Sequence, residues 1–154
     1  MIIEAAAWDD PDVQRLTTDQ QAEVRARYGG KDEPGAHPSA ADVAVVLVAR
    51  DGDGTPLGCG ALRPLGEGVA EVKRMYVVPA ARGRGVSKEV LAALEDAART
   101  RGWPVLRLET GPLQPEAVGL YGGAGYRPIA AFGAYVGDPD GAGSLYFEKR
   151  LADT

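Results

Sequence analysis

One long segment of the chain has the apolar spacing of an amphipathic helix. Within residues 85–101, Val86, Val90 and Leu94 recur every four positions, while charged residues occupy the positions between them. Residues three or four positions apart lie on the same side of a helix, so this pattern predicts a helix with one apolar face. Gly102 is typical of the residue that ends such a helix.

A second helix is predicted over residues 11–28. Asp10 can cap its first turn, and Pro11 suits a first helical position, where an N–H would have no partner in any case. The glycine pair at 29–30 marks its end. The segment that follows, residues 31–40, combines glycine, two prolines and several charges, and it is predicted to be a loop.

The remaining apolar segments are short and rich in β-branched residues, which is typical of strands. Residues 51–54, Asp-Gly-Asp-Gly, form a strong hairpin signal between two of these segments. Pro79 ends another, because proline cannot donate to a strand ladder. A short helix is predicted to begin at Pro115 and to end among the glycines that follow. The predicted strands cover residues 2–7, 43–49, 56–62, 70–78, 105–109, 126–131 and 144–149.

The order of these elements predicts a mixed α/β fold. Strand 70–78, helix 85–101 and strand 105–109 form one strand–helix–strand unit, and such a crossover makes its two strands parallel and its connection right-handed. The chain has 154 residues and shows no internal repeat or linker, so we expect a single domain over residues 1–154.

The composition argues against several classes of protein. A formal net charge of -5 disfavours general nucleic-acid binding, which depends on a basic surface. No apolar run approaches the roughly 20 residues of a membrane-spanning helix, and the first residues lack the features of a signal peptide. We therefore expect a cytoplasmic protein without membrane contact. One cysteine, Cys59, and one histidine, His37, supply neither a disulfide nor a zinc site.

The most informative segment lies where a predicted strand gives way to a predicted helix. Residues 82–87 read Arg-Gly-Arg-Gly-Val-Ser. The first N–H groups of a helix have no internal partner and carry partial positive charge, so together they attract anions. Gly83 and Gly85 let a phosphate approach the backbone closely, and Arg82 and Arg84 supply charged donors. This arrangement predicts a phosphate-binding loop.

The common nucleotide-binding motifs do not account for this loop. The pattern G-x-x-x-x-G-K-[ST] is absent, and G-x-G-x-x-G fails because Lys88 stands where the third glycine belongs. The loop also follows the fourth predicted strand, whereas the dinucleotide pattern normally follows the first. An ATP-binding protein is therefore an alternative that the motifs disfavour, and competition between ATP and coenzyme A would test it.

Three segments together resemble the GNAT acetyltransferase superfamily. Residues 82–87 resemble its R-x-x-G-x-[GA] loop, with Ser87 in place of the usual glycine or alanine. Residues 71–77 resemble the preceding strand, and residues 120–126, Leu-Tyr-Gly-Gly-Ala-Gly-Tyr, resemble its L-Y-x-x-x-G-[FY] segment. The resemblance covers about residues 43–149. It implies the GNAT fold, a twisted and largely antiparallel sheet with a splayed central parallel strand pair, flanked by helices.

The resemblance implies that the cofactor is acetyl-coenzyme A. In this family the pantetheine arm lies in the gap where the parallel strands splay, and the pyrophosphate lies on the backbone amides of the glycine loop. A backbone N–H near Met75 or Tyr76 would hold the thioester oxygen as it gains negative charge. The cofactor-binding residues implied in this way are Met75, Tyr76, Val77, Arg82, Gly83, Arg84, Gly85, Val86 and Ser87.

The resemblance also implies N-acetyl transfer to a primary amine by direct attack in a ternary complex. An alkyl amine has a pKa near ~10 in water, so it must lose a proton before it attacks. Glu71 lies where several family members place a carboxylate base, acting directly or through water. Tyr121 matches the usual general acid. From position alone, Glu71 would be a solvated residue at the start of a strand, and Tyr121 would pack its ring in the core.

Candidate contacts to the acceptor come from two strands and the last long loop. Lys73 and Arg74 point to opposite faces of a regular strand, so one of them, with Arg74 as the candidate, is expected to enter the acceptor cleft and favour a carboxylate. Glu109 ends its strand where the amine should arrive. Tyr135 lies in the loop 132–143 and is expected to line the acceptor site.

Other interpretations stay open. The chain could be a non-catalytic coenzyme-A-binding regulatory module, which would keep the glycine loop and lose the acid and base. Cys59 could carry a covalent acetyl group, although a free cysteine is usually a small buried hydrophobe. The acceptor is expected to be a small-molecule amine or a protein amine. Members of the family are often dimers, which makes a homodimer an option for this chain too.

Overall fold

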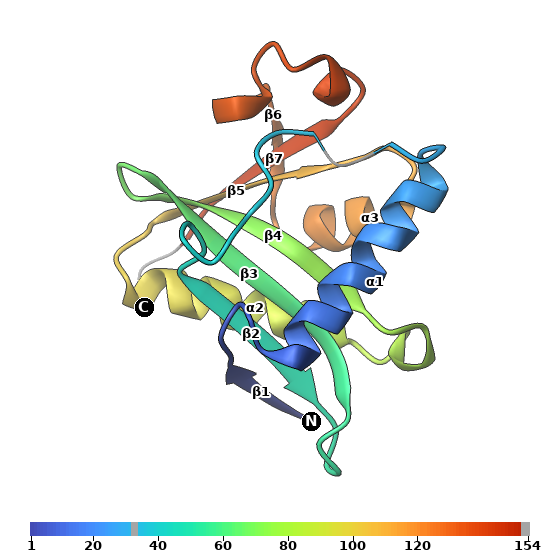
Figure 1. The fold of residues 1–154 in the computed structure, drawn as a ribbon. Helices are drawn as coiled ribbons and strands as arrows, with labels where there is room; N and C mark the ends of the chain where they lie inside the picture. Colours follow the sequence, from blue (N-terminus) through green and yellow to red (C-terminus); the bar gives the residue numbers. More distant parts are fainter. Residues whose placement is uncertain (32–33, 152–154) are drawn as a thin grey trace.

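The computed structural model describes residues 1–31 and 34–151. In this part of the chain the strands form one seven-stranded sheet in the order β1-β2-β3-β4-β5-β7-β6 (Figure 1). The strands are β1 (Ile2–Ala5), β2 (Val45–Arg50), β3 (Pro56–Gly66), β4 (Val69–Val77), β5 (Val105–Thr110), β6 (Arg127–Ile129) and β7 (Leu145–Arg150). Each predicted strand is therefore present, and the mixed α/β prediction is confirmed.

The centre of the sheet contains its parallel pair. Strand β4 pairs with β5 in parallel, and the other neighbouring strands in the described chain pair antiparallel. The parallel register covers only Val69–Glu71 of β4 and Val105–Arg107 of β5. Beyond these residues β4 continues its pairing with β3, while β5 continues its pairing with β7. The two strands therefore splay apart, as the resemblance implied.

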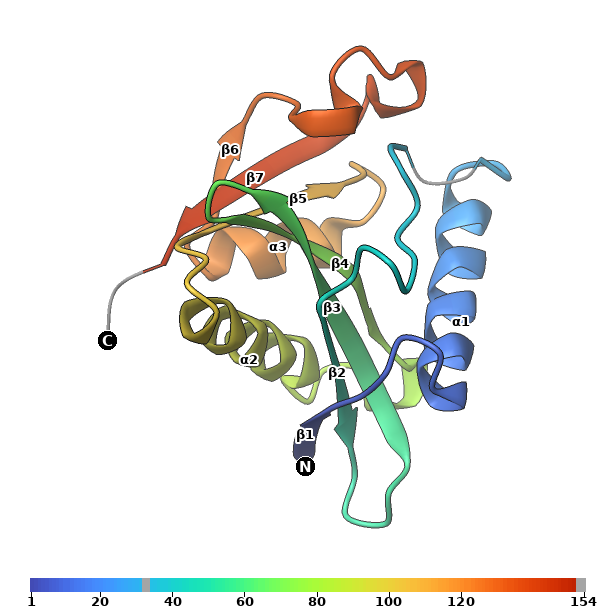
Figure 2. The same cartoon turned by 60° about the vertical axis from the view of Figure 1, so that its left-hand side comes forward.

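The two long helices cover opposite faces of the sheet (Figure 2). On one face, α2 (Val86–Thr100) buries Val90 and Leu94 against the central strands, and the short helix α3 (Pro115–Gly123) joins the same core through Tyr121. On the other face, α1 (Pro11–Arg27) buries Val13 and Leu16 against β2 and β3. The sheet therefore separates two apolar cores, and the glycine loop before α2 lies at one end of the layer.

Three local differences from the prediction have physical causes. Strand β3 runs to Gly66, because the two-residue turn Glu67–Gly68 has positive φ at both positions and so lets the β3–β4 hairpin pair to its end. The strand predicted over 126–131 shortens to Arg127–Ile129. The loop 132–143 contains two single 3₁₀ turns, η2 (Gly133–Tyr135) and η3 (Pro139–Gly141).

Among the described residues, none of the helices has both the length and the hydrophobicity that crossing a membrane would require.

Candidate active site

Strand β4 contains a β-bulge where it passes β3. Between the pairs Ala61–Lys73 and Cys59–Tyr76, β4 carries two residues while β3 carries one. Arg74 lies in this bulge with φ of 59°, a left-handed conformation that costs a non-glycine residue roughly 1–3 kcal/mol. The bulge interrupts the alternation of side chains, so Lys73 and Arg74 line the same cavity. The prediction of opposite faces assumed a regular strand, and the bulge removes that condition.

A cavity of about 680 Å³ runs through the gap between β4 and β5. Its walls come from α1, β4, the glycine loop, the end of β5, α3 and the loop before β7. This volume suits a ligand of cofactor size. The cavity joins the N-terminus of α2 to the exposed edge of β4, so one extended ligand can contact both.

The N-terminus of α2 is open for an anion. Gly85 is the N-cap residue with φ of 77°, and no side chain of the described residues caps the helix. Gly83 also has positive φ, and a Cβ added at either glycine would meet nothing within 4 Å. The first-turn amides thus keep their donor capacity, and Val86 and Ser87 line the cavity beside them. These features fit the pyrophosphate of coenzyme A.

The two arginines of the glycine loop have different positions. Arg82 lines the cavity, where its Nε donates to the Val77 carbonyl at 3.0 Å and its Nη2 lies 3.0 Å from a carboxylate oxygen of Glu23. The Nη2 of Arg84 lies 3.8 Å from Asp51 in the β2–β3 turn. Arg84 is not among the described residues that line the cavity. The side chain of Arg82, and not that of Arg84, is therefore placed to meet a phosphate.

The last residues of β4 form the long wall of the cavity. Met75, Tyr76 and Val77 all line it. They lie beyond Glu71, where pairing with β5 ends, so within the described residues the β4 edge toward β5 has no strand partner there. An unpaired strand edge binds an extended chain through its backbone groups. This edge fits the amide-containing pantetheine arm of coenzyme A.

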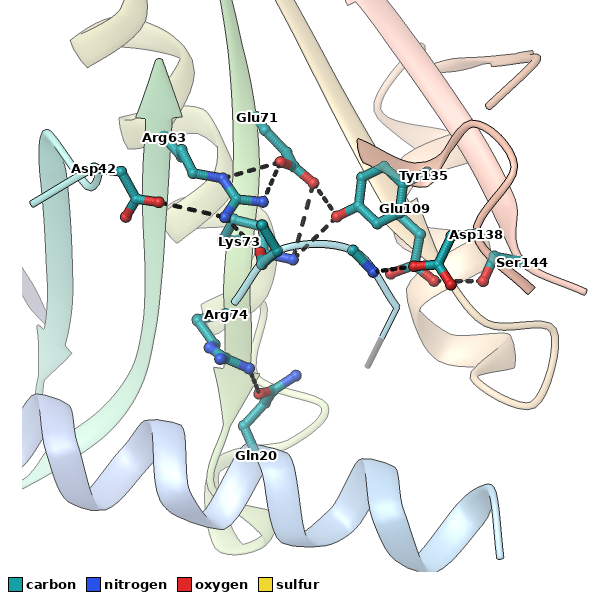
Figure 3. A network of polar contacts seen from close by, with 12 residues as sticks. Gln20, Asp42, Arg63, Glu71, Lys73, Arg74, Glu109, Tyr135, Asp138 and Ser144 are labelled. Atoms are coloured by element: carbon teal, nitrogen blue, oxygen red, sulfur yellow. Dashed lines mark hydrogen bonds and ion pairs between the residues drawn. The ribbon is translucent and has the colours of Figure 1, made fainter. Parts of the chain in front are cut away.

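Glu71 lies behind the cavity wall in a buried polar network (Figure 3). It is 1% exposed, so the expectation of a solvated strand residue is wrong. Its Oε1 accepts from Arg63 Nη2 at 2.7 Å, and its Oε2 accepts from the hydroxyl of Tyr135. The Nζ of Lys73 lies 3.9 Å from Oε2. Within the described part of the chain, Glu71 is not among the residues that line the cavity.

Tyr135 belongs to the same network. It is 3% exposed and packs edge-on against Phe132, and its hydroxyl accepts from Lys73 Nζ at 3.2 Å. Burial and the adjacent Glu71 carboxylate raise the pKa of Tyr135, so it remains a donor to Glu71. Like Glu71, it is missing from the cavity lining that the described residues form. The structure therefore places Tyr135 as a support for the loop before β7.

Tyr121 and Glu109 face the cavity from α3 and β5. Burial raises the pKa of Tyr121, and the charge of Glu109 raises it further, so the phenol is protonated at neutral pH. The Oε2 of Glu109 accepts from the Ser144 hydroxyl at 2.6 Å. A protonated donor and a carboxylate acceptor therefore share one wall.

The remaining candidates lie away from this chemistry. Cys59 is 1% exposed and donates to the Arg74 carbonyl at 3.3 Å, and burial raises the pKa of its thiol to about 12. His37 is exposed in the loop before β2. Residues 1–31 and 34–151 contain no group of three or more metal-ligating side chains that could hold an ion.

Sequence reasoning missed the contribution of two elements. Helix α1 and the residue that ends it contribute Gln20, Glu23 and Tyr28 to the cavity lining. The Tyr28 hydroxyl accepts a hydrogen bond from the Leu113 amide at 3.0 Å. No motif marks these residues. Arg63, the partner of Glu71, lies directly opposite it in the β3–β4 hairpin, but it falls beyond the strand predicted over residues 56–62, so the prediction did not pair the two.

The chain is similar to known acetyltransferases. A model of the acetyltransferase (GNAT) family matches residues 6–126. A protein of Azospirillum brasilense named IAA acetyltransferase is 44% identical over 106 residues, which cover 68% of this chain and 67% of that protein. The uncharacterized N-acetyltransferase YsnE of Bacillus subtilis is 34% identical over 96 residues, which cover 61% of this chain and 62% of YsnE.

Solved structures share the fold over nearly the whole chain. A Klebsiella pneumoniae protein provisionally named as an acyl-CoA N-acyltransferase superposes with a TM-score of 0.83 and 34% identity, covering 98% of this chain and 97% of that one. PaiA N-acetyltransferase from Thermoplasma acidophilum, solved with coenzyme A, superposes with a TM-score of 0.68 at 17% identity, covering 98% and 100%. The second likeness concerns the fold alone.

Proposed function

The chain belongs to the GNAT family of acetyltransferases, and we propose that it transfers an acetyl group from acetyl-coenzyme A to the primary amine of a small molecule. The observation that carries this proposal is the continuity of one cavity. The cavity joins an uncapped helix N-terminus to the unpaired edge of β4, and it continues to Tyr121 and Glu109. The groups proposed to bind the phosphates, position the thioester and transfer protons therefore all lie along this one cavity.

Acetyl-coenzyme A would supply an activated acyl group as a thioester. The amides of residues 82–87 and the guanidinium of Arg82 would hold its pyrophosphate, since a helix N-terminus and a charged donor reinforce each other. The backbone of residues 75–77 would bond the pantetheine arm. Preorganised backbone donors there would stabilise negative charge on the thioester oxygen. One such donor typically stabilises the transition state by roughly 3 kcal/mol.

The proton transfers require one acid and one base on the cavity wall. Tyr121 fits the acid by its position, because it lines the cavity and its raised pKa keeps it protonated at neutral pH. Glu71 was the base implied by the resemblance, but Arg63 and Tyr135 occupy its carboxylate behind the wall. Glu109 lines the cavity and is therefore the carboxylate that we assign to accept the proton of the acceptor ammonium.

The buried position of the only cysteine favours direct attack by the amine over a route through an acetyl-cysteine. Cys59 is buried, and its raised pKa keeps the sulfur protonated at neutral pH. A protonated thiol is a poor nucleophile. A covalent acetyl-cysteine step is thus disfavoured, and amine and thioester are expected to react while both are bound.

Calorimetric binding of acetyl-coenzyme A to Gly85→Asp tests the proposed cofactor site. The aspartate puts a Cβ and a negative charge over the N-terminus of α2. Two unit charges about 4 Å apart at an effective dielectric constant near 20 interact by about 4 kcal/mol. We therefore expect the affinity to fall by at least about 100-fold, which corresponds to about 2.7 kcal/mol.

Gly102→Asp is the matched control. Gly102 follows the same helix at its other end, has a positive φ of 76°, and likewise has nothing within 4 Å of an added Cβ. The two variants thus carry the same backbone strain and the same charge, and Gly102→Asp should bind like the wild type. Equal binding by all three proteins would contradict the cofactor site. Binding without thiol release for any amine would favour the non-catalytic module.

A further inference from the structure

The bulge in β4 brings two cations to one stretch of the cavity. Lys73 and Arg74 are consecutive, yet both line it, because the extra residue cancels the alternation of the strand. Arg74 Nη1 is directed toward α1, where it contacts Gln20 Oε1 at 3.5 Å, while Lys73 Nζ donates to Tyr135 (Figure 3). The two cationic groups therefore spread over the wall from the α1 side to the loop side.

These cations lie away from the phosphate end of the cavity. Val77 is the last residue of β4 before the turn that leads to the glycine loop. Lys73 lies four positions before it in the sequence, which is a distance of roughly 13 Å along the strand. The glycine loop and Arg82 already provide donors for the pyrophosphate. Lys73 and Arg74 are therefore placed to meet the acceptor and not the phosphates of the cofactor.

The other strand of the splayed pair supplies a negative charge to the cavity. Glu109 comes from β5, two residues beyond the last pair that β5 makes with β4. Its charge acts together with burial to raise the pKa of Tyr28 and Tyr121, which both line the cavity. Glu109 lines the same cavity as both tyrosines. Lys31 and Asp140 also line it and contribute one charge of each sign.

We propose that the acceptor is an amino-carboxylate, a small molecule that carries a free carboxylate a few bonds from its reacting amine. Arg74 binds the carboxylate, and the amine lies toward Glu109. This inference rests on the proposed function. An arginine fits a carboxylate through two parallel hydrogen bonds, which makes it more selective than a simple positive charge. A polyamine or another polycation would place like charges against the bulge.

The test compares acceptors that differ only in the carboxylate. Release of coenzyme A thiol is measured for common α-amino acids, β-alanine and γ-aminobutyrate, each against the amine that its decarboxylation leaves. The paired amines lack the carboxyl carbon but keep the rest of the carbon chain and a similar basicity. For any pair that the enzyme turns over, we expect kcat/KM for the amino acid to be at least 10-fold higher than for its paired amine.

Arg74→Gln identifies the residue responsible. It should lower the acid-to-amine ratio of kcat/KM at least 10-fold, through KM for the acid, and Arg74→Lys should restore part of the ratio. Arg15→Gln, which removes an exposed arginine of α1, is the charge-matched control and should keep the ratio. Unchanged acetyl-coenzyme A binding by Arg74→Gln shows that the variant is folded.

The failures of the two proposals are distinguishable. Equal turnover of acids and amines, turnover of amines alone, or a ratio untouched by Arg74→Gln would overturn the amino-carboxylate inference and leave the acetyltransferase proposal in place. Binding of acetyl-coenzyme A without turnover of any acid or amine would overturn both.

Discussion

Replacing Tyr121 with phenylalanine is expected to lower kcat by roughly 10²- to 10⁴-fold, the usual contribution of a general acid. The ring would keep its place in the α2–α3 core, because only the hydroxyl is removed. Since the buried ring stays, the change should leave stability and acetyl-coenzyme A affinity close to wild type. Thiol release under saturating substrates, with calorimetry for binding, measures both.

Tyr126→Phe is the control for the aromatic packing. Tyr126 contacts Tyr121 edge-on with ring centroids 5.7 Å apart, but its hydroxyl donates to Glu95 at 2.8 Å. Removing that hydroxyl should cost about 1.5–3 kcal/mol of stability, the value of a hydrogen bond to a charged group, with little change in kcat. A similar loss of kcat in both variants would show that packing, and not proton donation, explains the effect of Tyr121→Phe.

The pH dependence provides a second check on Tyr121. A phenol ordinarily titrates near pH ~10, and both burial and Glu109 move the pKa of Tyr121 above that value. The acid form is therefore present throughout the neutral and mildly alkaline range, and kcat should show no alkaline fall below about pH 10 that depends on this residue. An alkaline fall below that pH that disappears in Tyr121→Phe would contradict the direction of the shift.

The sequence predicted the features that depend on local chemistry. The glycine loop was found because its backbone conformation favours glycine: Gly83 and Gly85 both have a positive φ and open space beside them. The strand–helix–strand unit was found because its signals come from neighbouring residues. These signals are the apolar spacing of residues 86–98 and the proline and glycine near the ends of the helix. The same holds for Pro11 and Pro115, which both begin helices.

Features that depend on the register of the sheet could not be predicted in this way. The bulge at Arg74 has no glycine to mark it, so strict alternation put Lys73 and Arg74 on different faces. Glu71 was assigned as solvated or catalytic because its surroundings come from β3 and from the loop before β7. The contribution of α1 to the cavity depends on helix orientation, which a single sequence does not specify.

Glu71→Ala is expected to lower the free energy of unfolding by about 3–5 kcal/mol, the cost of breaking a buried ion pair by removing one partner. The variant leaves the guanidinium of Arg63 and the ammonium of Lys73 buried near each other without the carboxylate between them. It also leaves the Tyr135 hydroxyl without its acceptor. Denaturant unfolding of the purified variant, with coincident fluorescence and circular dichroism transitions, measures this change.

Asp96→Ala separates burial from ion pairing. Asp96 pairs with Arg99 at 2.8 Å, nearly the 2.7 Å between Arg63 and Glu71, but its side chain is 78% exposed. An exposed pair of this kind contributes at most about 1 kcal/mol, so this variant should unfold close to the wild type. An equally small effect of Glu71→Ala would mean that the buried network does not hold the loop before β7 against the sheet.

Glu71→Gln decides between the structural role of this residue and the base role that the family resemblance implied. A glutamine has nearly the same shape but cannot accept the proton of an acceptor ammonium. If Glu71 only positions Arg63, Lys73 and Tyr135, the variant should lose stability while the pH dependence of kcat/KM keeps its shape, since Glu109 remains on the wall. A stable variant that loses turnover and the acidic limb of its pH profile would instead make Glu71 the base, reached through water. Comparing the same profile in Glu109→Gln then shows which carboxylate receives the proton, because one substitution should remove the limb and the other should not.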